Sequence, residues 1–153
     1  MTFGTKFVGL ASIAAICASV TLAVAGGHTP VEQREAIMQT MGKSAKTIGD
    51  MLKGDTAFDA AVANEALVAM QDAVANMGDL FPEGTELAGE NENAAGPAIW
   101  TDRAGFDAKI AAFQEDIAAA VSAAPQEQQA MAAAFGEVAQ NCQSCHEAYR
   151  VKK

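Results

Sequence analysis

The sequence predicts an all-α fold, specifically an antiparallel four-helix bundle. Alanine, methionine, glutamate and glutamine are frequent and runs of β-branched residues are few, a composition that favours helices over strands. Four segments repeat apolar residues at helical spacing, so each presents one apolar face. Four such faces need a common interior, and a helix bundle provides it.

Residues 1–25 have the pattern of a secretory signal peptide, which leaves one domain at 26–153. Lys6 supplies the positive charge, the chain from there to Val24 is almost wholly apolar or small, and Ala23-Val24-Ala25 fits an A-x-A cleavage site. An uncleaved membrane anchor is the alternative, but the alanine content and the two glycines that follow favour cleavage after Ala25. We therefore expect a periplasmic protein without a membrane segment.

The first two helices are predicted at about 31–53 and 57–78. Thr29 and Glu32 form a capping box with Pro30 at the first helical position, and Gly54 marks the end of the first helix. Their apolar stripes are Ile37/Met38, Met41, Ala45, Ile48 and Leu52, and then Phe58, Val62, Ala66, Met70, Val74 and Met77.

The last two helices are predicted at about 102–122 and 125–149, after a long polar connection over 79–99 that contains several Gly and Pro residues. Thr101 or Asp102 caps the third helix, and Pro125 opens the fourth. Their stripes are Phe106, Ile110, Phe113, Ile117 and Val121, and then Met131, Phe135, Val138, Cys142, Cys145 and Tyr149.

The last helix carries Cys142-Gln143-Ser144-Cys145-His146, a C-x-x-C-H motif, which is the attachment signature of c-type haem. At about 100° per residue, both thiols and the imidazole project from one arc of the helix about 100° wide. A haem edge lying against that arc can accept two thioether bonds while the imidazole reaches the iron. The motif therefore predicts a covalent haem with His146 as axial ligand.

Other uses of these thiols fit less well. A structural zinc site needs four ligands, and beyond the motif the exported chain offers only the remote His28. A thioredoxin-like dithiol belongs in a βαβ context, which is not predicted. A disulfide between residues three apart in a helix would constrain little and would leave His146 unexplained.

The charge balance excludes several function classes. The formal net charge is −9, and loss of Lys6 with the signal leaves nine basic residues against nineteen acidic ones. Such a surface repels nucleic acid and anionic lipid. No Ser/His/Asp set, phosphate-binding glycine loop or paired-carboxylate site stands out, so the sequence does not predict an ordinary enzyme.

The mature chain resembles cytochrome c′, the class II c-type cytochromes, over essentially its whole length. The resemblance is carried by Arg34-Glu35-Ala36-Ile37-Met38, Leu80-Phe81-Pro82-Glu83-Gly84-Thr85, Ala98-Ile99-Trp100-Thr101-Asp102 and the segment from Cys142 to Arg150. It implies one haem c per chain, bound through Cys142 and Cys145 and ligated by His146. It also implies a homodimer formed through the first two helices.

The resemblance further implies three residues of the haem pocket. Arg34 would lie near a haem propionate, Met38 would close the distal face, and Arg150 would lie near the exposed proximal side. Each has a simpler interpretation: Arg34 as a solvated cation, Arg150 as a cation complementing the helix dipole, and Met38 as a core residue like Met41. Phe81 and Trp100 fit aromatic core packing better than a pocket wall.

The family suggests a five-coordinate iron that binds nitric oxide or carbon monoxide, transfers single electrons, or does both. If the sulfur of Met38 or Met41 ligates the iron instead, the protein is a six-coordinate electron carrier, since a Met/His pair raises the potential and blocks gas binding. A haem-free helical binding module with a structural dithiol is a third hypothesis. The redox partner protein is not indicated.

Overall fold

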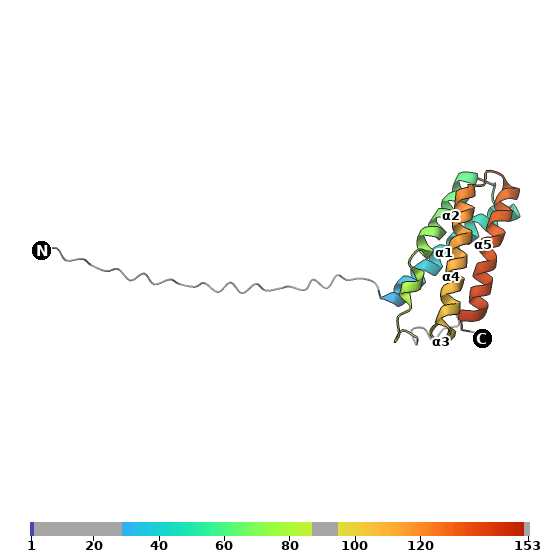
Figure 1. Cartoon of the computed structure of the whole chain (residues 1–153). Helices are drawn as coiled ribbons and strands as arrows, with labels where there is room; N and C mark the ends of the chain where they lie inside the picture. Colours follow the sequence, from blue (N-terminus) through green and yellow to red (C-terminus); the bar gives the residue numbers. More distant parts are fainter. Residues whose placement is uncertain (2–28, 87–94, 152–153) are drawn as a thin grey trace.

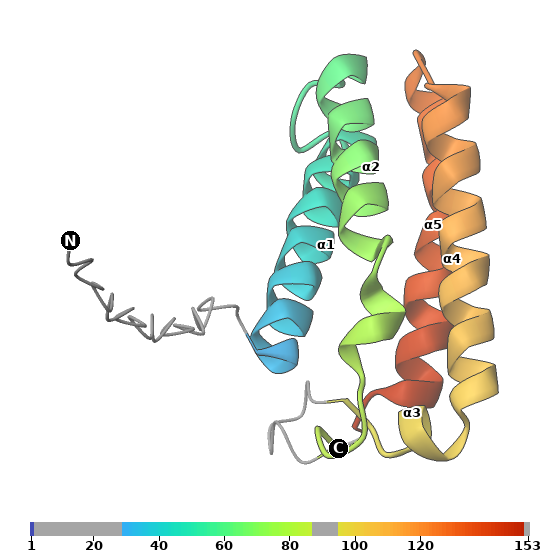
Figure 2. The same ribbon diagram turned by 60° about the vertical axis from the view of Figure 1, so that its left-hand side comes forward.

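The computed structural model describes Met1 and residues 29–86 and 95–151. Four long helices lie side by side in an elongated bundle (Figures 1 and 2), which confirms the predicted all-α fold. They are α1 (Pro30–Lys53), α2 (Ala60–Val74), α4 (Arg103–Ala123) and α5 (Gln128–Tyr149), and two short helices, η1 (Met77–Leu80) and α3 (Ala98–Thr101), lie in the connection between α2 and α4. None of the helices in this described part is long and apolar enough to span a membrane. The predicted signal peptide and its cleavage site lie, except for Met1, outside the described residues.

Helix α1 begins and ends as its sequence predicts. The Thr29 hydroxyl accepts a hydrogen bond from the Glu32 backbone N–H at 3.3 Å, and the Glu32 carboxylate accepts one from the Thr29 N–H at 2.7 Å. Gly54 follows the last turn with a φ of 82°, a left-handed conformation that glycine adopts without strain. Its N–H donates to the carbonyls of Asp50 and Met51.

Two other helix starts differ from the prediction. Helix α2 begins at Ala60 rather than 57, because the Asp59 carboxylate accepts from the N–H groups of Ala61 and Val62 at 2.9 and 3.1 Å and so caps the helix. Helix α5 begins at Gln128 rather than at Pro125. Ala124 has a φ of 41°, and the chain becomes helical only after Glu127, whose backbone is extended.

The region predicted as one helix to residue 78 is interrupted. Helix α2 ends at Val74, and the chain continues as the 3-10 helix η1 before it enters the connection to α4. Arg103 holds this segment against α4, since its guanidinium donates to the carbonyls of Gly78 at 2.8 Å and Phe81 at 3.2 Å. Helix α3 lies at the end of the bundle where α1 begins and α5 ends (Figure 2).

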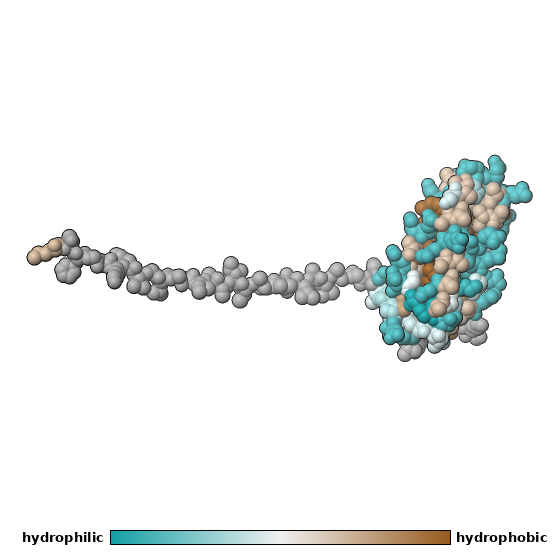
Figure 3. Space-filling model, viewed as in Figure 1, coloured by the Kyte–Doolittle hydropathy of each residue, from teal (hydrophilic) through white to brown (hydrophobic). Residues whose placement is uncertain are grey.

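The core takes residues from all four long helices, while polar residues cover most of the visible surface (Figure 3). The fully buried side chains include Ile48, Leu67, Met70, Val74, Phe106, Ile117, Met131 and Val138. The predicted stripe of α2 is wrong at Val62, which is exposed. The buried face of that helix is formed instead by Ala63, Ala66, Leu67, Met70 and Val74.

Candidate haem site

The C-x-x-C-H motif occupies the last two turns of α5. Both thiols are half-buried and free, and Cys145 packs against the hydrophobic core. Burial raises the pKa of both thiols, and the positive charge of Lys109 only partly opposes this for Cys145. At neutral pH the two cysteines are therefore protonated thiols, set on one side of the helix and partly open to solvent.

His146 lies beside the thiols with its ring only partly covered. This partial desolvation lowers the pKa of its imidazole, and the positive charge of Arg150 lowers it further. The imidazole is therefore neutral at pH 7, and neutral imidazole is the form that ligates iron. In the described part of the chain, no group of three or more His, Cys, Asp or Glu side chains is arranged to hold a metal ion.

Arg34 is a buried cation, so its interpretation as a solvated residue is wrong. Its side chain is 8% exposed, and its guanidinium carbon lies 4.7 Å from the centre of the Phe81 ring. Nε donates to the Pro30 carbonyl at 3.3 Å and Nη2 to the Thr85 carbonyl at 3.4 Å, but Nη1 is buried without a hydrogen-bond partner among the described residues. A buried guanidinium with a free N–H is an incomplete site for a carboxylate.

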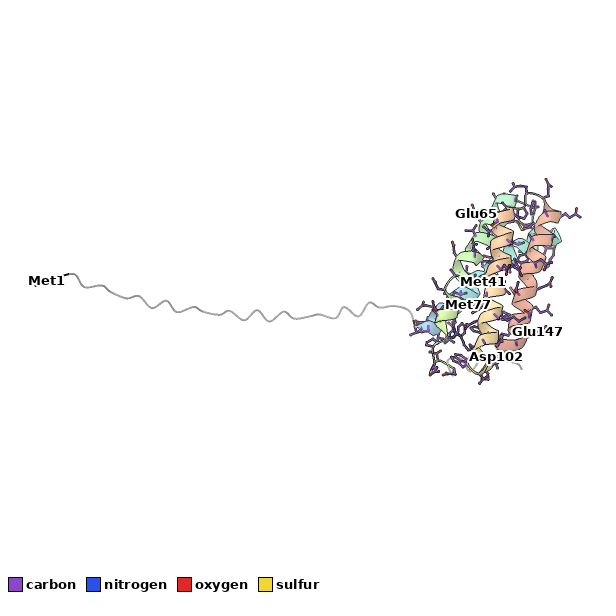
Figure 4. The ribbon with its side chains drawn as sticks, in the orientation of Figure 1. Met1, Met41, Glu65, Met77, Asp102 and Glu147 are labelled. Carbon is purple, nitrogen blue, oxygen red and sulfur yellow. The ribbon has the colours of Figure 1, made fainter. Side chains whose placement is uncertain are left out.

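The two candidate distal methionines occupy different environments. Met41 is 8% exposed and belongs to the core, and it lies well inside the bundle (Figure 4). Met38, one turn after Arg34, is 38% exposed, so the core interpretation holds for Met41 and fails for Met38. The sequence could not separate them because both fall on the apolar stripe of α1.

Arg150 is the residue that directly follows helix α5. Helix α5 ends at Tyr149, and Arg150 has an extended backbone that forms an isolated bridge with Ala95. Its positive charge lowers the pKa of the His146 imidazole. The side chain is exposed.

An aromatic cluster closes the end of the bundle next to the motif. Phe81 packs edge to face on Phe106 at 4.8 Å between ring centres, and Phe106 packs similarly on Tyr149 at 5.3 Å. Trp100 lies 6.1 Å from Phe81 and donates from Nε1 to the Pro82 carbonyl. Core packing is thus the main role of Phe81, as its sequence context suggested.

Comparison with known proteins identifies the family. A sequence model described as Cytochrome C′ matches residues 29–150, which is most of the chain. The chain belongs to the cytochrome c′ family. It is 39% identical over 126 residues to cytochrome c′ of Rhodopseudomonas palustris, covering 80% of this chain and 82% of that protein. It is 34% identical over 123 residues to cytochrome c-556 of Agrobacterium fabrum, with 80% and 82% covered.

Solved structures of the cytochrome c′ family share the fold. Cytochrome c′ from Rhodopseudomonas palustris superposes with a TM-score of 0.75 at 35% identity, covering 83% of this chain and 99% of that one. A nitric oxide complex of a mutant cytochrome c prime from Alcaligenes xylosoxidans gives a TM-score of 0.70 at 30% identity, with 83% and 99% covered. Like the rest of its family, the chain is a haem c protein of the electron-transfer and gas-binding class, so the hypothesis of a haem-free module is wrong.

The residues present fit covalent haem c. Two free thiols and a neutral imidazole lie together on α5, and the unpaired N–H of Arg34 suits a propionate. The partial exposure of Cys142, Cys145 and Met38 leaves apolar surface that a porphyrin would cover.

One contact near this site could not be predicted from the sequence. Tyr149 donates a hydrogen bond to Asp102 at 2.8 Å, and no local pattern links residues 47 positions apart.

Proposed function

We propose that this protein is a periplasmic cytochrome in which Cys142 and Cys145 hold the haem by thioether bonds and His146 is the single axial ligand of the iron. In this five-coordinate form it binds nitric oxide or carbon monoxide, transfers single electrons, or does both. The bound haem supplies a redox-active iron with one open coordination position. The chain supplies the proximal ligand, the anchoring and the control of access to the distal face.

Arg34 is proposed to hold a haem propionate. Its guanidinium already lies in a fixed position, since the Phe81 ring and two backbone carbonyls contact it. The unpaired Nη1 would donate to a carboxylate oxygen, which removes the cost of leaving that group unsatisfied in the interior. Arg150 is proposed to lie near the proximal side of the haem, where its charge acts on His146.

The observation that carries the functional proposal is the exposure of Met38. Met41 is packed into the core, whereas Met38 is an exposed apolar side chain on the same stripe. A methionine has three rotatable side-chain bonds and adapts to irregular space. Met38 is therefore suited to cover the distal face and to move aside when a diatomic ligand binds. The structural likeness to a nitric oxide complex in this family supports the same use.

A second candidate is a six-coordinate electron carrier in which the sulfur of Met38 ligates the iron. The observation in its favour is again the exposure of Met38, because packing in the core does not keep its sulfur away from the haem. A relative at 34% identity is named cytochrome c-556 rather than cytochrome c′. In this form gas ligands would have to displace the thioether, and single-electron transfer would be the whole function.

Two matched substitutions separate the candidates. We expect Met38→Leu to leave the ferrous absorption spectrum high-spin and to change nitric oxide affinity only through altered crowding. Met41→Leu is the control, because it changes a methionine of the same stripe that is buried in the core. Conversion of a low-spin wild-type spectrum to high-spin by Met38→Leu alone would establish the six-coordinate candidate.

Export and dimer formation are further parts of the proposal. The signal pattern of residues 1–25 supports export, and the mass of the protein isolated from the periplasm tests cleavage after Ala25. Val62 and Val68 are exposed on α2, which supports a homodimer formed through α1 and α2. Light scattering of the purified holoprotein measures that assembly.

A further inference from the structure

Three side-chain hydrogen bonds join α4 and its N-cap to the C-terminal part of α5. Tyr149 Oη donates to Asp102 Oδ2 at 2.8 Å, Lys109 Nζ to Ser144 Oγ at 3.3 Å, and Asn141 Nδ2 to Asp116 Oδ2 at 2.6 Å. The partners on α4 and its N-cap are spaced by seven residues, so they follow one face of that helix. The two helices run side by side in both ribbon views (Figures 1 and 2), and we call these three bonds the α4–α5 polar ladder.

The haem-attachment residues lie between the α5 residues that form this ladder, and each of its three hydrogen bonds is called a rung. Cys142 lies between Asn141 and Ser144 in the sequence. Cys145 and His146 lie between Ser144 and Tyr149. Because all three motif side chains are attached to the same helix, a rotation of α5 about its axis redirects them together. The same rotation would break the rungs, since their donors and acceptors lie on two different helices. The ladder therefore opposes the motion that would misdirect His146.

The end of α5 is held especially closely. The Gly96 N–H donates to the Tyr149 carbonyl at 2.7 Å, and a Cβ at Gly96 would lie 2.8 Å from that oxygen. A Cβ at Gly105 would lie 2.5 Å from Tyr149 Oη, so the Asp102–Tyr149 rung also needs a glycine beside it. Helix ends ordinarily fray, and His146 lies only three residues before this one ends. These contacts hold the last turn in place.

We propose that Tyr149 and Asn141 are positioning residues for His146: through the α4–α5 polar ladder they set the direction in which the axial imidazole meets the iron. This inference rests on the proposed role of His146. It concerns residues that are not proposed as iron ligands, and it gives the hydrogen bonds between α4 and α5 a role in tuning the haem in addition to stabilising the fold.

The test compares neutral-for-neutral variants of the holoprotein, so that no charge is removed. We would prepare Tyr149→Phe, Asn141→Ala and the double variant. The control is Gln128→Ala, which removes the hydrogen bonds from the first turn of the same helix to the carbonyls of Met51 and Leu52. Proton NMR of the ferric protein with labelled histidine reads the imidazole, since the only other histidine is His28. The reduction potential is the second readout.

We expect the hyperfine-shifted His146 resonances and the potential to move in each ladder variant, to move further in the double variant, and to stay in place in Gln128→Ala. Unmoved resonances in the double variant would overturn the inference while leaving the proposed ligand intact. Equal changes in Gln128→Ala would also overturn it, because general loosening of α5 would then explain them. If wild type shows no hyperfine-shifted histidine, His146 is not the ligand, and both proposals fall.

Discussion

At the scale of single residues, Arg34 is the clearest reason to propose a haem propionate contact. A guanidinium that is 8% exposed, stacked on Phe81 and left with one unpaired N–H is costly unless an anion completes it. In the proposed site a haem propionate would be that anion, and it would account for the burial of this charge.

Removal of this cation should lower the reduction potential. A positive charge near the haem favours the reduced state, which carries one positive charge fewer, so Arg34→Leu is expected to shift the potential downward by tens of millivolts. A tenfold change in a one-electron equilibrium corresponds to about 59 mV. Spectroelectrochemical titration measures the shift, with Lys46→Met, an exposed position on α1, as the control. A potential equal to that of wild type would refute the propionate contact.

Arg150 should influence how firmly His146 resists protonation. Its charge lowers the pKa of the imidazole, so the neutral form persists to lower pH than it otherwise would. Arg150→Gln removes that charge and lets the proton compete better with the iron. We expect the acid midpoint for loss of imidazole ligation to rise, as measured by absorption of the ferric protein across pH.

The control for Arg150→Gln is Lys53→Gln. It removes one exposed positive charge in the last turn of α1, at the opposite end of that helix from Pro30. This variant should keep the wild-type midpoint. If both substitutions move the midpoint equally, net charge and not the local action of Arg150 is responsible.

At the scale of elements, the helix ends show which boundaries could be predicted from the sequence and which could not. The capping box of α1 was predictable because its partners are three residues apart, and the C-x-x-C-H motif was predictable for the same local reason. The starts of α2 and α5 were misplaced because Phe58 and Pro125 suggested helix, while Asp59 and the left-handed Ala124 set the actual boundaries. The Tyr149–Asp102 contact depends on the folded chain and left no local pattern.

The cap of α2 gives a stability prediction. Asp59→Ala removes the acceptor of two backbone N–H groups, so the free energy of unfolding should fall by about 1 kcal/mol. Chemical denaturation of the holoprotein, followed by far-ultraviolet circular dichroism, measures the loss.

Asp55→Ala is the matched control for this cap. Asp55 is an equally acidic, exposed residue between α1 and α2, and no helix N–H is bound by its side chain in the described part of the chain, so its replacement should change stability by less than about 0.5 kcal/mol. Equal losses in the two variants would contradict the assignment of Asp59 as the N-cap.

At the scale of the whole molecule, different helices carry the haem-attachment motif and the residues proposed for the distal face and the propionate. Helix α5 carries the two thiols and the imidazole, while α1 carries Arg34 and Met38. The formal net charge of −9 is expected to repel nucleic acid and would not hinder small neutral ligands. The sequence could predict α5 and its cofactor, whereas the difference between Met38 and Met41 depended on the packing of α1 in the bundle.

In the proposed holoprotein the iron has one axial ligand from the chain and an open distal position beside Met38. The absorption spectrum of the ferrous wild-type protein, recorded before and after addition of carbon monoxide, reports on both features. We expect a high-spin spectrum that shifts to that of a carbon monoxide complex. A low-spin ferrous spectrum that carbon monoxide leaves unchanged would contradict this proposal and establish a six-coordinate electron carrier.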